Sequence, residues 1–257
     1  MRVLVISDVH ANLIALDEVL NDAASVEWLG QTGFDAIWSL GDIVGYGPWP
    51  NECIQRLQQF GGHVRVAGNH DWAALGHLDL EEFNREARKM VLWTQKQLDR
   101  ASLAYLRGLP DQPLQHGAFT VTHGSPREPI WEYISNGSVA RENFPYISTP
   151  YCLVGHTHVP RIYRLPTDAT VDAGTCSVHG PVYDRDIVLA GAHSLIINPG
   201  SVGQPRDNDP RAAYALLDVE HACWRYRRVR YDVEITQAAM RKANLPERLI
   251  TRLAYGW

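Results

Sequence analysis

Short apolar runs that each end in a polar loop are the feature that most constrains how this chain folds. Residues 3–6 form one such run, rich in β-branched side chains, and Ser7-Asp8-Val9-His10 follows it directly. A second run, residues 36–40, ends at Gly41-Asp42. Runs of this length and composition are typical of strands that are buried on both faces. A helical pattern follows each of these loops, so the sequence predicts strand, loop and helix in repeated order.

The same pattern recurs along the chain and predicts most of its regular structure. We expect strands at residues 3–6, 36–40, 63–67, 118–122, 151–154, 195–197, 213–217 and 222–231. We expect helices after the N-cap residue Asn12 and at residues 48–60, 79–107, 233–243 and 246–254. Near Asp111, helix-separated strands give way to strand-rich sequence. We interpret this change as two halves of one core, so residues 1–257 are expected to form a single domain.

Composition and charge narrow the class of protein. The chain has 257 residues, is 45% hydrophobic and carries a formal net charge of -5, which argues against a protein that coats nucleic acid. None of the four cysteines lies in a Cys-x-x-Cys pair, which suits free thiols in a reducing compartment. No apolar run is long enough for a signal peptide or a membrane span. We therefore expect a soluble, cytoplasmic protein with no membrane partner.

Five of the loops that follow predicted strands carry side chains able to bind a metal or a proton. These side chains are Asp8, His10, Asp42, Asn69, His70, His123, His156 and His158. Taken singly, each has a structural explanation, because a carboxylate or amide can cap the next helix and a histidine can pack in the core. Ligands at the carboxyl ends of parallel strands, however, converge on one crevice. Five of the eleven histidines fall in these few loops, which favours a shared site.

The types of side chain in these loops indicate which metals such a site would bind. Carboxylates, imidazoles and an amide oxygen are present without a thiolate, which is typical of a catalytic site for Mn²⁺, Fe, Zn²⁺, Co²⁺ or Ni²⁺. Seven ligands are too many for one metal and suit two metals that share one carboxylate. Asp42 is the residue expected to bridge them, since a carboxylate has two oxygens to offer.

The motifs, taken in order, resemble those of the calcineurin-like metallophosphoesterase superfamily. They are Asp8-x-His10, Gly41-Asp42, Gly68-Asn69-His70-Asp71, His123 and Gly155-His156-Thr157-His158. Two further stretches resemble its small prokaryotic phosphodiesterase branch, namely residues 45–48 and residues 198–206. The resemblance implies an α/β fold, a two-sheet β-sandwich flanked by helices in α-β-β-α layers, which agrees with the predicted strands.

The resemblance also implies a ligand set and a mechanism. One divalent metal would be held by Asp8, His10, Asp42 and His158, and the second by Asp42, Asn69, His123 and His156. Mn²⁺ is the expected metal, with Fe, Zn²⁺, Ni²⁺ and Co²⁺ as alternatives. A metal-bridging hydroxide would attack a phosphodiester, and His70 would protonate the leaving alkoxide, oriented by Asp71 or by a backbone carbonyl. One departure from the family pattern is Ala11, where many relatives have glycine.

The expected substrate is a small phosphate ester, and stable nucleic-acid binding is not expected. Arg206, in the loop after residues 195–197, is a candidate to bind the substrate phosphate, because a guanidinium can clamp two phosphate oxygens. It could instead pair with Asp207 or Asp209, or lie solvated at the surface. A dinucleoside polyphosphate hydrolase, a phosphoprotein phosphatase and a non-catalytic binding scaffold of the same fold are the alternative functions. The sequence does not predict an oligomeric state.

Overall fold

Two stacked β-sheets form the centre of the protein in a computed structural model that describes residues 1–61, 64–166 and 176–257. Within these residues the first sheet has the strand order β11-β14-β13-β1-β4-β5. Its strands are β1 (Arg2–Ile6), β4 (Ala36–Ser39), β5 (Val64–Arg65), β11 (Asp186–Val188), β13 (Ala212–Asp218) and β14 (Cys223–Val229). β1, β4 and β5 run parallel, whereas β13 pairs antiparallel with β1. The carboxyl ends of β1, β4 and β5 therefore lie at one edge of this sheet.

The second sheet has the order β10-β9-β12-β8-β7-β6 within the described part of the chain. Its strands are β6 (Leu114–His116), β7 (Phe119–Val121), β8 (Tyr151–Leu153), β9 (Arg161–Pro166), β10 (Ser177–His179) and β12 (His193–Asn198). β7, β8 and β12 are parallel to one another. A short hairpin of β2 (Glu27–Trp28) and β3 (Gln31–Thr32) lies outside both sheets.

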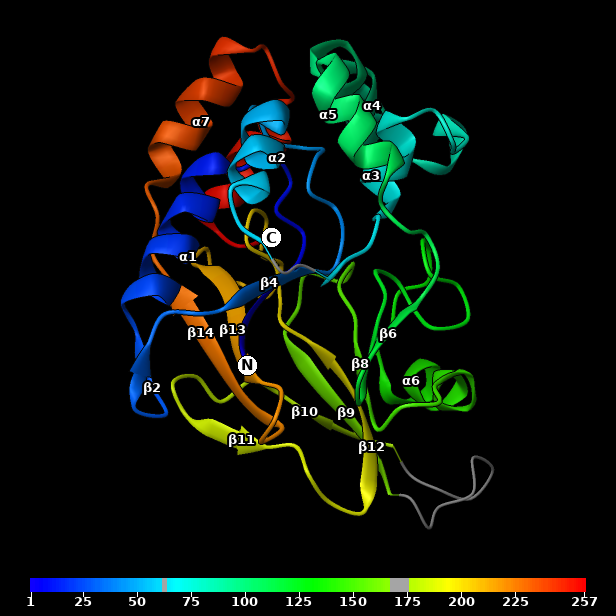
Figure 1. The fold of residues 1–257 in the computed structure, drawn as a ribbon. Coiled ribbons are helices and arrows are strands. Elements are labelled where there is room, and N and C mark those ends of the chain that lie inside the picture. Colours follow the sequence, from blue (N-terminus) through cyan, green and yellow to red (C-terminus); the bar gives the residue numbers. More distant parts are fainter. Residues whose placement is uncertain (62–63, 167–175) are drawn as a thin grey trace.

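Helices cover the outer faces of the sandwich (Figure 1). α1 (Leu13–Ser25), α2 (Pro50–Gln58) and α7 (Val233–Lys242) lie on the side of the first sheet, and α6 (Gly137–Asn143) lies beside the second. The remaining helices are α3 (Asn69–Ala74), α4 (Arg85–Gln97), α5 (Arg100–Arg107) and α8 (Glu247–Thr251), with 3₁₀ turns η1 (Leu80–Glu82), η2 (Phe144–Tyr146) and η3 (Arg252–Ala254). The predicted two-sheet sandwich flanked by helices is confirmed.

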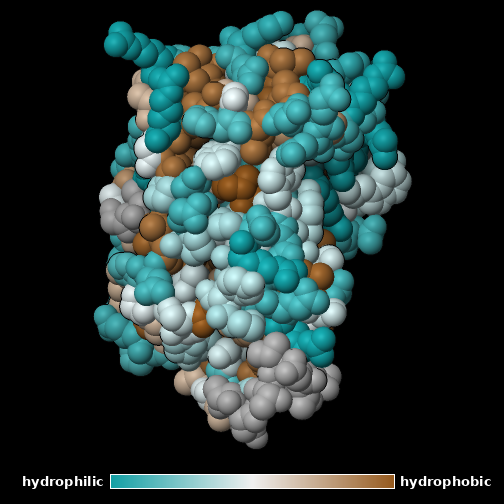
Figure 2. Space-filling model, turned by 90° about the vertical axis from the view of Figure 1, so that its right-hand side faces the viewer, coloured by the Kyte–Doolittle hydropathy of each residue, from teal (hydrophilic) through white to brown (hydrophobic). Residues whose placement is uncertain are grey.

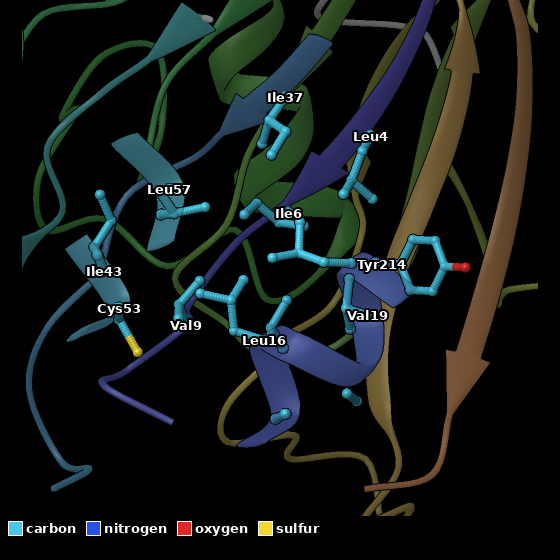
Figure 3. Packing of buried hydrophobic residues seen from close by; sticks show 14 of the residues in the cluster. Leu4, Ile6, Val9, Leu16, Val19, Ile37, Ile43, Cys53, Leu57 and Tyr214 are labelled. Atoms are coloured by element: carbon cyan, nitrogen blue, oxygen red, sulfur yellow. The ribbon is translucent and has the colours of Figure 1, made fainter. Parts of the chain in front are cut away.

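The alternation of side chains along β1 shows why this strand must be apolar on both faces. Val3 and Val5 pack between the sheets, in a cluster that also holds Trp38 of β4 and residues of β7 and β8. Leu4 and Ile6 point the other way and pack against α1 and α2 (Figure 3). Since successive strand residues face opposite sides, a strand between two layers needs an uninterrupted apolar run.

The face of the molecule shown in Figure 2 mixes hydrophilic and hydrophobic side chains. On the face that carries α4, α5 and α6, hydrophobic side chains are scattered among polar ones and gather mostly at the end with α4 and α5 (Figure 2). Leu92 of α4 is one of the exposed large hydrophobic residues of the molecule. Across the described ranges, no helix has both the length and the apolar character needed to cross a bilayer.

The structure corrects three local expectations. The helix predicted at 79–107 is instead η1, α4 and α5, because Asn84 and Asp99 accept hydrogen bonds from the amides of Ala87 and Ser102 and so cap two separate helices. The strand predicted at 63–67 is described only as Val64–Arg65, and residue 63 lies outside the described residues. Residues 69–71, expected in a loop, form the start of α3.

Candidate metal centre

Loops at the carboxyl ends of strands from both sheets bring the first group of candidate ligands together. Asp8 follows β1, Asp42 follows β4, and His158 follows β8. With His10, each of them offers one atom to a cluster in which all these atoms lie within 4.8 Å of one another. His158 Nε2 is 3.2 Å from Asp8 Oδ1, and His10 Nε2 is 3.6 Å from Asp42 Oδ2. These separations are those of groups that can share one small cation.

A second group shares Asp42 and extends toward the second sheet. His123 Nε2 lies 3.4 Å from Asp42 Oδ2 and 3.1 Å from His156 Nδ1. Asn69 Oδ1 lies 3.3 Å from the same His123 nitrogen, so its amide oxygen faces this group. The structure thus brings together all seven side chains predicted as ligands, with Asp42 common to both groups.

The buried carboxylates show that the donor set fits divalent cations. Asp8 Oδ1 and Asp42 Oδ2 are buried and have no hydrogen-bond partner within the described part of the chain. Burying a carboxylate oxygen without a partner is costly, and cation coordination satisfies it. Both oxygens lie beside imidazole nitrogens, which gives the O and N donors that Mn²⁺, Fe and Zn²⁺ accept. The residues therefore fit two ions that share Asp42.

Backbone carbonyls fix which nitrogen each imidazole offers. His10 Nδ1 donates to the carbonyl of Val44 at 3.1 Å, and the Nδ1 atoms of His123 and His158 donate to the carbonyls of Leu40 and Gln204. His156 uses its two nitrogens the other way round. Its Nε2 donates to the Trp131 carbonyl at 3.0 Å, so its Nδ1 faces the cluster. Such hydrogen bonds hold a histidine in the tautomer that binds a metal.

Burial and mutual charge set the protonation of the cluster. Burial raises the pKa of Asp8 to about 7, and the charge of Asp42 adds to the effect. Burial lowers the pKa of three of the imidazoles well below the usual range: His10, His156 and His158. Burial alone would also lower the pKa of His123, but the carboxylate of Asp42 raises it to about 9. Since metals bind neutral imidazole, His123 is the ring that must release a proton on metal binding.

The backbone of the candidate ligands is strained. Asp8, His10, Asp42, His156 and His158 all have positive φ, between 47° and 64°. Left-handed conformations cost non-glycine residues about 1–3 kcal/mol each and persist only where the surroundings impose them. Strain of this kind concentrates at functional sites, and here it turns the side chains of successive loop residues toward one point.

Two small residues, Ala11 and Gly68, shape the backbone of the ligand loops. Ala11 has φ of 50° and is fully buried, so the first loop holds the left-handed conformation with a residue other than glycine. At Gly68 a Cβ atom would lie 2.1 Å from Asp42 Oδ1, a distance that no side chain tolerates. Glycine at this position lets α3 begin directly beside the shared carboxylate.

His70 lies next to the cluster without joining it. It is buried, its ring centroid is 5.0 Å from that of His10 and 4.4 Å from that of Tyr46, and its Nδ1 has no hydrogen-bond partner among the described residues. Burial lowers the pKa of His70 to about 4. The carboxylate of Asp71, one of two groups expected to orient His70, instead accepts hydrogen bonds from the amides of Val44 and Gly68. Asp71 therefore links the loop after β4, through Val44, to Gly68 at the start of α3.

Arg206 lies close to the cluster, and neither expected structural partner binds it. Its Nη2 donates to Gln204 Oε1 at 2.8 Å, and its guanidinium lies 5.8 Å from the centre of the Tyr46 ring. Asp207 pairs with Arg228, and Asp209 pairs with Arg211. The positive charge of Arg206 also lowers the pKa of His158, after the larger effect of burial. Among residues 1–61, 64–166 and 176–257, no carboxylate side chain pairs with Arg206, which thus leaves a cation beside the cluster.

Several residues of the site were not predicted. Tyr46 packs against both His10 and His70, and Ser7 Oγ donates to Asp8 Oδ2 at 2.6 Å. Tyr133 stacks on His156 with ring centroids 3.7 Å apart. The motif around Tyr46 was visible in the sequence, but nothing in it indicated the contact. Tyr133 comes from a loop with no sequence signal of its own.

A two-sheet sandwich with carboxylates and imidazoles at the strand ends defines a metallophosphoesterase. Residues 1–222 match the profile of the calcineurin-like phosphoesterase superfamily domain. The protein therefore belongs to this superfamily, whose members are hydrolases that act on phosphate esters and use divalent metals.

Three similar proteins share this sequence or fold. A metallophosphoesterase from Sphaerobacter thermophilus has 48% sequence identity and a TM-score of 0.85, covering 100% of this chain and 99% of its own. An uncharacterized protein of Methanocaldococcus jannaschii is 36% identical, over 98% of this chain and 97% of that protein. A hypothetical protein from Pyrococcus horikoshii OT3 has the same fold, with a TM-score of 0.76 at 22% identity over 100% of this chain and 98% of its own.

Proposed function

We propose that this protein is a dinuclear-metal-dependent phosphodiesterase that acts on a small phosphate ester. One ion would be held by Asp8, His10, Asp42 and His158, and the other by Asp42 with a second set of ligands: Asn69, His123 and His156. Bound there, two divalent cations would activate water as the nucleophile and neutralise charge that develops on the phosphate. Mn²⁺ is the metal we expect.

The single observation that carries this proposal is the pair of buried carboxylate oxygens without a partner in the described structure, Asp8 Oδ1 and Asp42 Oδ2. Each faces imidazoles whose other nitrogen is already held by a backbone carbonyl. A scaffold without metal would have no reason to bury two carboxylates so close together with oxygens that accept no hydrogen bond, because such burial destabilises the fold.

The position of His70 suits the role of general acid once a substrate is bound. Burial lowers the pKa of His70 to about 4, and the negative charge of a phosphate ester beside the ring would raise it again. Its ring centroid lies 5.0 Å from that of His10, yet His70 is not among the clustered candidate ligands. Its amide donates to Asp42 Oδ1 at 2.8 Å, which ties the acid to the shared carboxylate. A proton supplied to the leaving alkoxide is worth typically about 10²–10⁴ in rate.

The test is turnover of bis(p-nitrophenyl) phosphate by protein that has been stripped of metal and then reconstituted. We expect activity to disappear on chelation and to return with Mn²⁺, in proportion to the metal bound per chain. Parallel reconstitution with Fe, Zn²⁺, Ni²⁺ and Co²⁺ identifies the preferred metal. Full turnover by chelated protein with no measurable metal would overturn the proposal.

A further inference from the structure

An arc of aromatic side chains borders the candidate metal centre. Phe83 lies against His70, with ring centroids 5.4 Å apart, and against Trp131, at 5.1 Å. The Trp131 ring lies 6.4 Å from that of His156. Tyr133 ends the arc, because its ring stacks on His156 with centroids 3.7 Å apart and planes 26° apart. The arc thus runs from the proposed general acid to a candidate ligand of the second ion.

Tyr133 differs from the other aromatic residues of the arc in its exposure. It is 46% exposed, whereas Phe83 and Trp131 are half-buried. In the described part of the chain, His156 is the only ring that packs on Tyr133, and the tyrosine hydroxyl has no hydrogen-bond partner. Because His156 covers one face of the ring, the exposed area belongs to the opposite face and to the ring edge.

The charges around Tyr133 place this open ring next to the groups that would hold a phosphate. Partial burial raises the pKa of the Tyr133 hydroxyl, the charge of Arg206 opposes the rise, and the carboxylate of Asp42 adds to it. The hydroxyl is therefore within electrostatic range of both the shared carboxylate and Arg206. His156, beneath the ring, directs its Nδ1 to the cluster.

The loop that carries Tyr133 is held on both sides of this residue. The carboxylate of Glu132 accepts a hydrogen bond from Arg127 Nε at 2.9 Å. The carbonyl of Ile134 accepts one from the Tyr163 hydroxyl at 2.7 Å. A surface that is fixed before binding loses little conformational entropy when a ligand stacks on it.

The place of the open face indicates how far from the phosphate a stacked group would lie. The phosphate would lie at the edge of His156, where Nδ1 faces the cluster, whereas a ring on Tyr133 would lie two ring spacings above the His156 plane. An aryl group bonded directly to the phosphate does not extend that far, but a planar ring joined through a sugar does. Nucleobases are such rings, and stacking on an aromatic side chain contributes about 1–3 kcal/mol per base.

We propose that Tyr133 is a specificity-determining residue that stacks on the nucleobase of a nucleotide ester whose phosphate lies at the metal centre. The inference rests on the proposed function and narrows its substrate class to esters with a planar base one sugar away from the phosphate. Since every base has a π face, Tyr133 selects for the presence of a base rather than for its identity.

Equilibrium binding of two matched ligands tests this proposal without relying on turnover. The first is the phosphonate analogue of thymidine 5′-monophosphate, in which a CH₂ group replaces the 5′ oxygen and prevents hydrolysis. The second is the same compound with a methoxy group in place of thymine. With Mn²⁺-loaded protein, we expect calorimetry to give a dissociation constant about tenfold lower for the first. Tyr133→Ala should reduce this ratio to less than about twofold, and Tyr133→Phe, which keeps the ring, should preserve it.

Tyr146→Ala is the matched control, because Tyr146 is a tyrosine of η2 that is 62% exposed and lies outside the arc. It should keep the tenfold ratio. Metal content and melting temperature are measured for every variant, and Tyr133→Leu replaces Tyr133→Ala if the smaller side chain unfolds the protein.

The outcomes separate this inference from the proposed function. Equal dissociation constants for the two ligands in the wild type, or no binding of either, would overturn the inference. So would an unchanged ratio in Tyr133→Ala, even with both ligands bound more weakly, because Tyr133 would then only support His156. Turnover of bis(p-nitrophenyl) phosphate by the same metal-loaded wild type judges the proposed function separately.

Discussion

Asp42 and His70 lie close together but are expected to fail in different ways when substituted. Asp42 is the carboxylate common to both ligand groups, so Asp42→Asn should lower bound metal well below two ions per chain. His70 lies outside both groups, so His70→Asn should keep the metal and lower kcat by about 10²–10⁴-fold. Metal content and steady-state kinetics are measured on both variants with a diester of a poor leaving group.

The leaving group provides an internal control for His70. A nitrophenolate departs without a proton, so His70→Asn should slow bis(p-nitrophenyl) phosphate much less than an alkyl diester. Equal losses on both substrates, or loss of metal in His70→Asn with metal retained in Asp42→Asn, would contradict the assigned roles.

Arg206 is expected to bind the phosphate that reacts. No carboxylate side chain of the described residues neutralises its charge. Its guanidinium donates to Gln204 Oε1 and keeps further N–H groups for the substrate phosphate. Arg206→Ala should lower kcat/KM by an amount that corresponds to a loss of about 1.5–3 kcal/mol of transition-state stabilisation. Metal content and melting temperature should be unchanged. Arg211→Ala, whose side chain pairs with Asp209, is the matched control and should have no such effect. An unaltered kcat/KM in Arg206→Ala would assign Arg206 a structural role.

At the scale of elements, Asn12 connects the first loop to two distant segments. Its Oδ1 accepts from the Ala15 amide and from Thr236 Oγ1 of α7, and its Nδ2 donates to the Gly203 carbonyl at 2.9 Å. Asn12→Ala removes a helix cap and two further buried hydrogen bonds, so it should lower the free energy of unfolding by about 2–3 kcal/mol.

Urea denaturation measures this loss. Asp99→Ala is the comparison, because Asp99 caps α5 through the Ser102 amide at the surface and should cost less. An equal loss in the two variants would mean that Asn12 acts only as a cap. Weaker metal binding in Asn12→Ala is also expected, since the same loop carries His10.

At the scale of the whole molecule, metal binding is expected to join the two sheets. Asp8 and Asp42 come from the first sheet, and His123, His156 and His158 from the second. Since the ligands converge only in the folded chain, binding stabilises it by about 4 kcal/mol at a free metal concentration 1,000 times the dissociation constant. Thermal unfolding with and without Mn²⁺ should show a higher melting temperature with metal. Asp42→Asn should largely lose this shift, and an equal shift in that variant would place the stabilising metal elsewhere.

The sequence by itself determined the strands and the loops that follow them. Runs such as residues 3–6 are apolar on both faces because they lie between two layers. This requirement acts on consecutive residues, so the apolar run itself predicts the strand. The spacing of Asp8 and His10, and of His156 and His158, likewise identified the candidate ligands, because the loops are short and the strands parallel.

Only the tertiary structure decided what depends on distant contacts. The break between α4 and α5 comes from Asp99 capping a second helix, which the helical periodicity of residues 79–107 conceals. Asp71 was one of two groups expected to orient the His70 imidazole, yet its carboxylate accepts from the amides of Val44 and Gly68, brought together by the pairing of β4 with β5. Arg252 and Tyr46 are about 200 positions apart and line the same cavity, because the chain packs them near each other without any local sequence pattern that would indicate it.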